Sequence, residues 1–256
     1  MSEKLNRLLT KWQKGEVITA RALERMQISP QLAKKYVESG WLHRVGNGAF
    51  ALSQDDVSWK GALQAMQSQL GMSVHVGGRS ALNLHGRAHY LPMNKYGTVT
   101  LISDGGERLP TWFKNYSWVV AFSHHAISLF DTPSSKTLSL HSDEGIQMSI
   151  STPERAILEE IRLATTNLAI EHAHLLLEGL TMLRPAVVQE LLEKCQSKKV
   201  KRFFLWSAHQ AGHRWVNKLE ETRLDLGKGK RQFYKGGSFD SRYNMTVPET
   251  EKNPNV

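Results

Sequence analysis

The fold of the N-terminal part of the chain is decided by residues 29–52, whose sequence is SPQLAKKYVESGWLHRVGNGAFAL. Ser29 is a favoured N-cap and Pro30 a favoured first helical residue, so a helix is expected over residues 30–39, ended by the glycine that follows. Two short apolar runs then flank the Gly-Asn-Gly sequence at 46–48, which is typical of a β-hairpin. This stretch therefore predicts a helix followed by a hairpin.

Two further helices are expected upstream of this stretch. Leu5, Leu8 and Trp12 recur at helical spacing, and Thr19 can cap a second helix over residues 20–27. Helix, helix, short turn, helix, hairpin is the order of a winged helix-turn-helix, whose third helix enters the major groove of double-stranded DNA. We therefore predict a winged helix-turn-helix DNA-binding domain over residues 1–54.

The open face of the third helix and the hairpin turn supply the candidate DNA contacts. The predicted DNA-binding residues are Ser29, Gln31, Lys34, Lys35, Arg44 and Asn47. Lysine and arginine suit phosphates, whereas Ser29 and Gln31 are candidates for reading base edges. A protein-binding role for this domain is the alternative, and the two lysines on the open face favour DNA.

The charge of the chain also favours an anionic partner. The 256 residues include 33 Lys and Arg against 24 Asp and Glu, a net charge of +9. Nine basic and four acidic residues fall in 1–54, and eleven basic and three acidic residues fall in 198–235. Two separated basic segments predict two contact surfaces, or two ends of one surface.

Composition excludes several classes of protein. The single cysteine, Cys195, excludes a disulfide framework and a zinc site built from several cysteines. The start of the chain is polar, and its longest apolar runs, such as 118–122, are too short to cross a bilayer. We therefore expect a cytoplasmic protein that does not contact a membrane.

Residues 55–247 predict a mixed α/β body with a helical C-terminal part, which makes the whole chain α+β. Helices are expected at 55–70 (capped by Asp55-Asp56), 77–86, from Pro153 onward, and at about 168–180, 185–196 and 198–216. Strands are expected at 73–76, 97–103, 117–122, 137–141, 146–150 and 243–247, the central ones in a mixed or antiparallel sheet. The polar tail, 248–256, is expected to be disordered.

The helix expected at 198–216 carries candidate partner contacts. Its apolar stripe leaves Lys198, Arg202 and Trp206 on the reverse face, and Lys230 and Arg231 follow in a basic segment at 228–235. These five residues are the predicted partner-binding set, since Trp and Arg are frequent binding hot spots. Two alternatives stay open: another element of the domain covers the reverse face, and the basic segment is a charged loop that leads to an edge strand.

Four motifs, taken in order, resemble the AbiEi-type antitoxins of type IV toxin–antitoxin systems. They are the Gly-x-Gly-aromatic hairpin at 46–50, the run GGRSALNLHG at 77–86, the helix opening TPERAIL at 152–158 and the stretch GGSFDSRYNM at 236–245. The resemblance implies a bacterial repressor of its own operon, which binds an operator with inverted repeats. It also implies that residues 55–247 counteract a cognate nucleotidyltransferase-type toxin.

Enzyme functions fit the sequence less well. Gly77-Gly78 could open a nucleotidyltransferase site, but no closely spaced carboxylate pair follows, and Asp104 and Glu107 are too far downstream. His209 and His213 share helical spacing without a third ligand, so hydrogen-bonded histidines are expected instead of a metal site. We therefore predict a protein that is not an enzyme and that needs no cofactor and no metal.

Two competing functions remain. A transcription factor without a toxin partner would use its second domain to sense a ligand or to oligomerise. An enzyme that modifies nucleic acid would use the basic C-terminal segment, and the missing carboxylate cluster is the argument against it.

Overall fold

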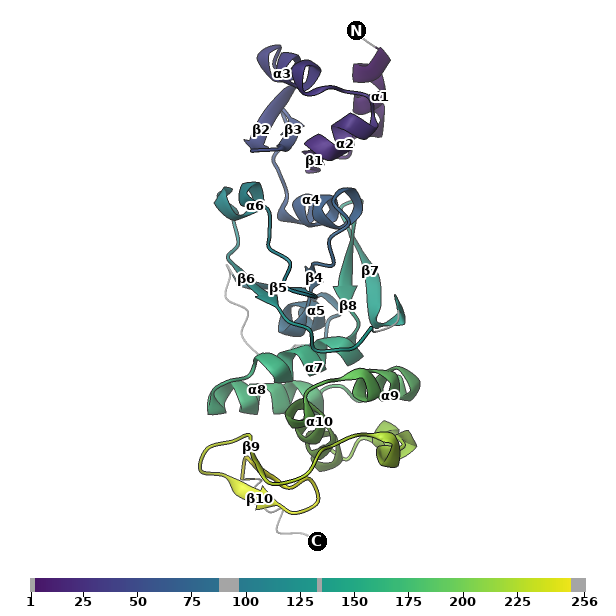
Figure 1. The fold of residues 1–256 in the computed structure, drawn as a ribbon, viewed down its shortest axis with the longest axis vertical. Helices are drawn as coiled ribbons and strands as arrows, with labels where there is room; N and C mark the ends of the chain where they lie inside the picture. Colours follow the sequence, from purple (N-terminus) through teal and green to yellow (C-terminus); the bar gives the residue numbers. More distant parts are fainter. Residues whose placement is uncertain (1–2, 88–96, 133–134, 250–256) are drawn as a thin grey trace. The chain divides into compact units, whose positions relative to one another are not determined.

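The structure, a computed structural model, describes residues 3–87, 97–132 and 135–249, and it divides into two compact units. The first unit is formed by the described residues of 1–75, 94–127 and 140–150, and the second by those of 76–93, 128–139 and 151–256. Both units contain helices and strands (Figure 1), so the expected α+β class is confirmed.

The N-terminal part of the first unit has the predicted order of three helices and a hairpin. Its elements are α1 (Glu3–Lys11), β1 (Ile18–Thr19), α2 (Ala20–Arg25), α3 (Pro30–Glu38), β2 (Leu42–Gly46) and β3 (Ala49–Leu52). Thr19 caps α2 as expected, since its side chain accepts a hydrogen bond from Ala22 N–H at 3.2 Å. The unpredicted β1 pairs with β3, which gives an antiparallel sheet of order β1-β3-β2.

One apolar cluster holds these elements together. It combines residues from all three helices and from the hairpin, including Leu8, Leu23, Ala33, Tyr36, Leu42 and Phe50. Their side chains recur at helical spacing or on one face of a strand, so their burial follows from the sequence pattern.

The rest of the first unit is built on a five-stranded sheet of order β6-β5-β4-β8-β7. Its elements are α4 (Trp59–Gln64), a π-helical turn (Ala65–Gln69), β4 (His75–Val76), β5 (Val99–Ser103), α6 (Thr111–Asn115), β6 (Phe122–Ala126), β7 (Leu138–Asp143) and β8 (Ile146–Ser151). Strands β5 and β6 pair in parallel, with Val99 opposite Phe122. Strands β4, β7 and β8 continue to the residues at which the chain enters the second unit.

Two predictions in this unit were wrong. The helix expected from Asp55-Asp56 begins after Ser58, whose side chain caps it, because the Asp55 carboxylate instead accepts a hydrogen bond from Trp12 Nε1 at 3.2 Å. The strand expected over 117–122 begins only at Phe122, because Trp118 folds back and donates its Nε1–H to Phe113 O.

The second unit packs helices around α7 (Figure 1). Its elements are α5 (Gly78–Leu84), α7 (Pro153–Leu163), α8 (Asn167–Glu178), α9 (Pro185–Lys194), α10 (Lys198–Gln210), β9 (Arg231–Gln232), β10 (Ser238–Asp240) and β11 (Met245–Val247), with single 3₁₀ turns at Ser135–Thr137, Arg214–Lys218 and Glu221–Arg223. Helices α5, α8, α9 and α10 all contact α7. The three strands form a small sheet of order β10-β11-β9.

The C-terminal helix is shorter than the predicted 198–216. Helix α10 ends at Gln210, Gly212 follows at φ +65°, and the chain continues as a 3₁₀ turn. Residues 250–256 of the expected tail lie outside the described residues. In the described part of the chain, every helix is too short or too polar to cross a bilayer.

Candidate nucleic-acid interface

Helix α3 begins as its sequence predicts. The Ser29 hydroxyl oxygen accepts a hydrogen bond from Leu32 N–H at 3.3 Å, and Pro30 occupies the first turn. Burial of the opposite helix face leaves three predicted contacts exposed to solvent: Gln31, Lys34 and Lys35. Ser29 therefore has a structural role as the cap, while its own O–H remains a potential donor.

The hairpin presents the other two predicted contacts. The β2–β3 register shifts between Arg44 and Gly46, and Gly48 adopts the left-handed φ of +79° that a tight turn needs. The Arg44 guanidinium lies over the Phe50 ring, 5.4 Å from its centroid. This contact orients a long cationic side chain that, like Asn47, stays exposed.

Helix α3 and the β2–β3 hairpin border the same hollow on the surface. Its volume is about 180 Å³. It is lined by Leu23, Pro30 and Ala33 from the helices and by Arg44, Asn47, Gly48 and Phe50 from the hairpin. The structure therefore brings the hairpin to the first turns of α3, although these residues are 11 or more positions apart in the sequence.

The charge at this surface is largely available to a partner. Lys34 Nζ lies 3.7 Å from the Glu38 carboxylate, but both side chains are more than half exposed, so this pair contributes little. Lys35 and Arg44 form no ion pair with any residue that the structure describes. The six predicted contacts are thus exposed, Arg44 and Asn47 line the shared hollow together with the acidic Glu24, and the role of the six in binding stays a prediction.

Two contacts that support the hairpin were not among the sequence predictions. A Cβ atom at Gly46 would lie 2.6 Å from Trp112 Cβ, so α6 packs directly against the end of β2. Gln69 is a second support, because its amide accepts from Thr19 N–H and donates to Val17 O, both at 2.8 Å. The glycine was the one signal in the sequence for the first contact, and nothing indicated the second.

The structure corrects the prediction for Arg202. Its side chain is only 2% exposed, and it donates hydrogen bonds to four backbone carbonyls in the segment that follows α10. The acceptors are Leu226 O, Gly227 O and Gly229 O at 2.8–2.9 Å and Asn244 O at 3.1 Å. Arg202 therefore organises the C-terminal segment and does not contribute to a surface.

Trp206 is corrected for the same reason. It is also 2% exposed and packs against Phe203 and His174, with ring centroids 5.4 and 5.1 Å apart. The reverse face of this helix was predicted either to bind a partner or to be covered by another element of the domain. The structure shows that other elements of the chain cover it.

The remaining three predicted partner contacts differ in their surroundings. Lys198 is partly buried and paired with Asp225. Lys230 and Arg231 are exposed, and Arg231 lies in β9 at the edge of the small sheet. Lys230 Nζ lies over the Phe239 ring at 5.1 Å. The basic segment thus leads to an edge strand, as its alternative interpretation predicted.

The Gly77-Gly78 motif forms the tight strand-to-helix turn before α5. Gly78 has a left-handed φ of +52°, and its N–H donates to Glu159 Oε2 at 3.1 Å. The next N–H, that of Arg79, donates to Glu160 Oε2 at 2.9 Å. The backbone donors that would hold a phosphate in a nucleotidyltransferase are therefore occupied by two carboxylates of α7.

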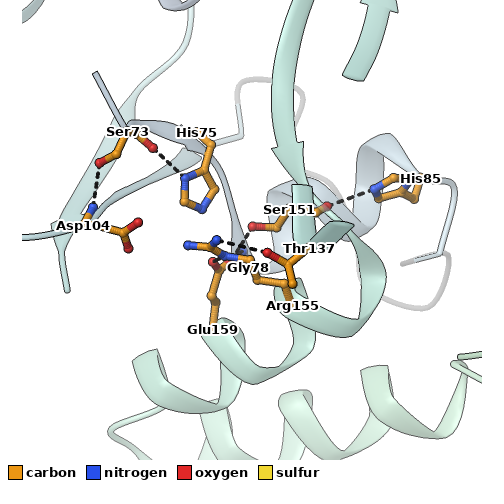
Figure 2. A network of polar contacts seen from close by, with 9 residues as sticks. All are labelled: Ser73, His75, Gly78, His85, Asp104, Thr137, Ser151, Arg155 and Glu159. Carbon is orange, nitrogen blue, oxygen red and sulfur yellow. Dashed lines mark hydrogen bonds and ion pairs between the residues drawn. The ribbon is translucent and has the colours of Figure 1, made fainter. Parts of the chain in front are cut away.

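Glu159 is fixed in this position by further contacts (Figure 2). It accepts hydrogen bonds from Ser151 Oγ and from Arg155 Nε, both at 2.7 Å, and Arg155 also reaches Thr137 Oγ1 at 3.4 Å. Both charged side chains of this pair are at most 3% exposed. A buried carboxylate that is held so firmly is costly to displace.

The acidic residues weighed for metal chemistry have structural contacts instead. Glu107 accepts hydrogen bonds from Ser73 N–H and Ser73 Oγ at 2.9 Å, and Asp104 N–H donates to the same hydroxyl at 2.9 Å. His209 contacts Glu221, and His213 contacts Leu177 O at 2.8 Å. Among the described residues there is no cluster of three potential ligands from His, Cys, Asp and Glu.

Comparisons with known proteins show two family matches along the chain. Residues 96–248 match a family described as "Transcriptional regulator, AbiEi antitoxin, Type IV TA system", and residues 1–93 match the "AbiEi antitoxin N-terminal domain" of such regulators. No curated protein sequence matches the chain.

A solved structure shares the fold. It is the RV2827C protein from Mycobacterium tuberculosis, which is 13% identical, with a TM-score of 0.56 over 94% of this chain and 88% of that one. At this identity the likeness concerns the fold alone. The family matches cover nearly the whole sequence. The chain therefore belongs to the AbiEi antitoxin family of transcriptional regulators of type IV toxin–antitoxin systems.

Proposed function

We propose that the chain is a DNA-binding repressor of its own operon and the antitoxin that counteracts a nucleotidyltransferase-type toxin encoded beside it. Residues 1–54 are its winged helix-turn-helix, and residues 55–247 are the antitoxin and regulatory domain. The observation that carries the DNA-binding half is that Lys34 and Lys35 are exposed on α3, and that Arg44 is exposed on the hairpin, which borders a hollow with the start of α3.

The partner at this surface is double-stranded DNA. The N-terminus of α3 adds its partial positive charge to Lys34, Lys35 and Arg44, which attract and position phosphates. Ser29 and Gln31 lie in the first turn, which in this type of domain reaches base edges in the major groove. Asn47 in the hairpin turn completes the contact from the adjacent groove or backbone.

This half of the proposal is tested by titrating the protein with DNA from just upstream of its gene and with a shuffled control. Lys34→Ala with Lys35→Ala should weaken operator binding and flatten the slope of log affinity against log salt by about 2, because two phosphate contacts are lost. Lys14→Ala with Lys136→Ala is the matched control, since it removes two exposed lysines elsewhere. Equal effects of the two double variants would refute the assignment to α3.

A role without catalysis is supported by the occupied turn before α5. Glu159 and Glu160 accept the hydrogen bonds of the two backbone N–H groups that a phosphate would need. A bound nucleotide would have to displace a carboxylate that is buried with Arg155. The family description, a transcriptional regulator and antitoxin, points the same way.

The toxin-directed half is assigned to the C-terminal segment. Lys230 and Arg231 are exposed, form no ion pair within the described residues, and stand beside the partly exposed Phe239. A cationic edge with an aromatic side chain suits an acidic protein surface. Charge reversal of Lys230 and Arg231 should reduce rescue of toxin-arrested growth, and full rescue at normal abundance would exclude this edge.

A further inference from the structure

We propose that a hollow beside α6, the helix that packs against the hairpin, binds a planar aromatic anion. We further propose that binding there shifts the hairpin. The hollow has a volume of about 600 Å³, within the roughly 300–1,000 Å³ that is common for small-molecule sites. Its walls come from α6, from the segment after it and from β6. The residues on which the proposal rests are Phe113, Lys114, Tyr116, Trp118, Phe122 and His124.

The aromatic walls are held rigidly by one another. The ring centroid of Phe113 lies 5.1 Å from that of Trp118 and 5.0 Å from that of Phe122. The ring centroids of Tyr116 and Trp118 are 4.4 Å apart. Trp118 is also fixed by its Nε1–H, which donates to Phe113 O at 2.7 Å. Preordered rings lose little conformational entropy on binding and offer offset or edge contacts to a flat ligand.

Two polar groups at the hollow define the charge of the ligand. Lys114 is exposed and forms no ion pair with any described residue, so its ammonium is available to an anion. His124 Nε2 is engaged by Ser103 Oγ at 2.9 Å, which leaves Nδ1 for a ligand. Burial, together with the charge of His125, lowers the pKa of His124 more than Glu107 raises it, so this ring is neutral at neutral pH.

The hollow is linked to the hairpin through three packed residues. Phe113 in its wall is preceded in the chain by Trp112, whose ring contacts that of Phe113 edge-on at 5.9 Å. Trp112 is 5% exposed and meets Gly46 so closely that a Cβ there would collide with it. Asn47, a predicted DNA contact, comes next in the chain. A shift of α6 on binding would therefore move the hairpin turn, and this regulatory step rests on the proposed DNA-binding function.

Binding is tested on the full chain without DNA, by calorimetric titration with 2-naphthoate and with the neutral 2-naphthalenemethanol as probes. The anion should bind at least about threefold more tightly than the alcohol, and Lys114→Ala should abolish that preference. Lys136→Ala, which removes an exposed lysine outside the hollow, should keep it. No heat at millimolar 2-naphthoate, equal affinity for both probes, or an unchanged preference in Lys114→Ala would each overturn the site.

A second variant tests the aromatic wall. Trp118→Leu should weaken 2-naphthoate at least about fivefold, because stacking contacts of this size are worth roughly 1 kcal/mol. Near-ultraviolet circular dichroism and urea unfolding check that the variant is folded. A folded Trp118→Leu protein with unchanged affinity would place the probe elsewhere and refute the assignment.

Coupling is tested separately, by measuring operator affinity with and without saturating 2-naphthoate. Wild-type affinity should change at least about fivefold, the lower limit of ordinary allosteric coupling, and the 2-naphthoate concentration that gives half of this change should be at least about threefold higher in Lys114→Ala. Ligand binding without any change in operator affinity would overturn the regulatory step. Operator affinity without ligand tests the proposed function itself, so the two failures are distinguishable.

Discussion

Arg202 is the clearest case of a residue whose role depends on its surroundings. Its guanidinium donates hydrogen bonds to four backbone carbonyls that lie 24 to 42 positions later in the chain. Those carbonyls belong to a segment with little regular structure, which must satisfy its polar groups through side chains. A single arginine therefore replaces the hydrogen bonds that a longer sheet would supply.

We predict that Arg202→Ala destabilises the protein by about 3 kcal/mol, because charge-assisted hydrogen bonds are lost and buried carbonyls are left without partners. Urea unfolding monitored by tryptophan fluorescence measures the effect. Lys230→Ala is the control, since this exposed side chain should change stability by less than about 0.5 kcal/mol. Equal unfolding midpoints for the two variants would contradict the structural role of Arg202.

Glu154 and Arg184 form a second decisive contact. Burial alone would raise the pKa of Glu154, but hydrogen bonds from the Arg184 side chain and backbone, at 2.8–3.0 Å, and the arginine charge together hold it below its usual value. A carboxyl with a depressed folded-state pKa stabilises the fold above its unfolded pKa of 4.5. That contribution is lost as the pH falls through the folded-state value.

Arg184→Met should therefore cost about 2 kcal/mol at pH 7 and less at pH 3.5, because without Arg184 burial favours the protonated form of Glu154, which becomes accessible as the pH falls. The figure is modest because the Arg184 side chain is 55% exposed. Urea unfolding at both pH values measures it. Arg223→Met removes the comparably exposed partner of Glu193 and should cost less than about 1 kcal/mol. A cost of Arg184→Met that does not depend on pH would refute the assignment to Glu154.

At the scale of elements, α5 and α7 are joined through a helix start. The N–H groups of Gly78 and Arg79 donate hydrogen bonds to the carboxylates of Glu159 and Glu160, so α7 provides the cap that the sequence of α5 lacks. The glycine motif and the helix opening at 152–158 were recognised separately in the sequence. The contact joins the glycine motif to Glu159 and Glu160, which directly follow the second motif, and it spans 81 positions. It explains why a motif suited to phosphate binding serves a structural purpose here.

Glu159→Gln should destabilise the protein by roughly 3 kcal/mol, because the buried Arg155 guanidinium loses the carboxylate charge at 2.7 Å. Glu160→Gln makes the same chemical change beside the more exposed Arg79 and should cost about 1 kcal/mol or less. Thermal unfolding of both variants measures the two losses of stability. A Glu160→Gln variant that is less stable than Glu159→Gln would show that burial does not set the strength of this contact.

At the scale of the whole molecule, the proposed DNA-directed and toxin-directed surfaces lie on different units. Lys34 and Lys35 belong to the first unit, and Lys230 and Arg231 belong to the second. Each unit has its own apolar core, so exposed substitutions in one should leave the packing of the other unchanged. The two activities should therefore be separable by mutation.

We predict that Lys34→Ala with Lys35→Ala relieves repression of an operon reporter and preserves rescue from the toxin. Lys230→Glu with Arg231→Glu should have the opposite pattern, because it changes only the second basic segment. Reporter activity and growth after toxin induction are measured in the same strain at matched protein abundance. Loss of both activities in either variant would argue against two independent surfaces.

The sequence by itself determined the features that depend on neighbouring residues. The caps at Thr19 and Ser29, the hairpin at 46–48 and the order of helices and strands follow from interactions over a few positions. The family could also be identified from motifs in order, since those motifs are local. The burial of the second face of α10 could not be predicted from the sequence. An amphipathic stripe shows which face of a helix is apolar, but it does not show whether another element covers the opposite face.

Only the tertiary structure decided which polar residues remain available to a binding partner or ligand. It buried Arg202 and Trp206, filled the turn before α5 with carboxylates, and gathered the aromatic residues of 113–122 around a hollow. The first two outcomes depend on partners 24 to 81 positions away, and the hollow depends on where Trp118 folds back. Burial and hydrogen bonding act through space, so the sequence pattern around each residue carried no signal for them.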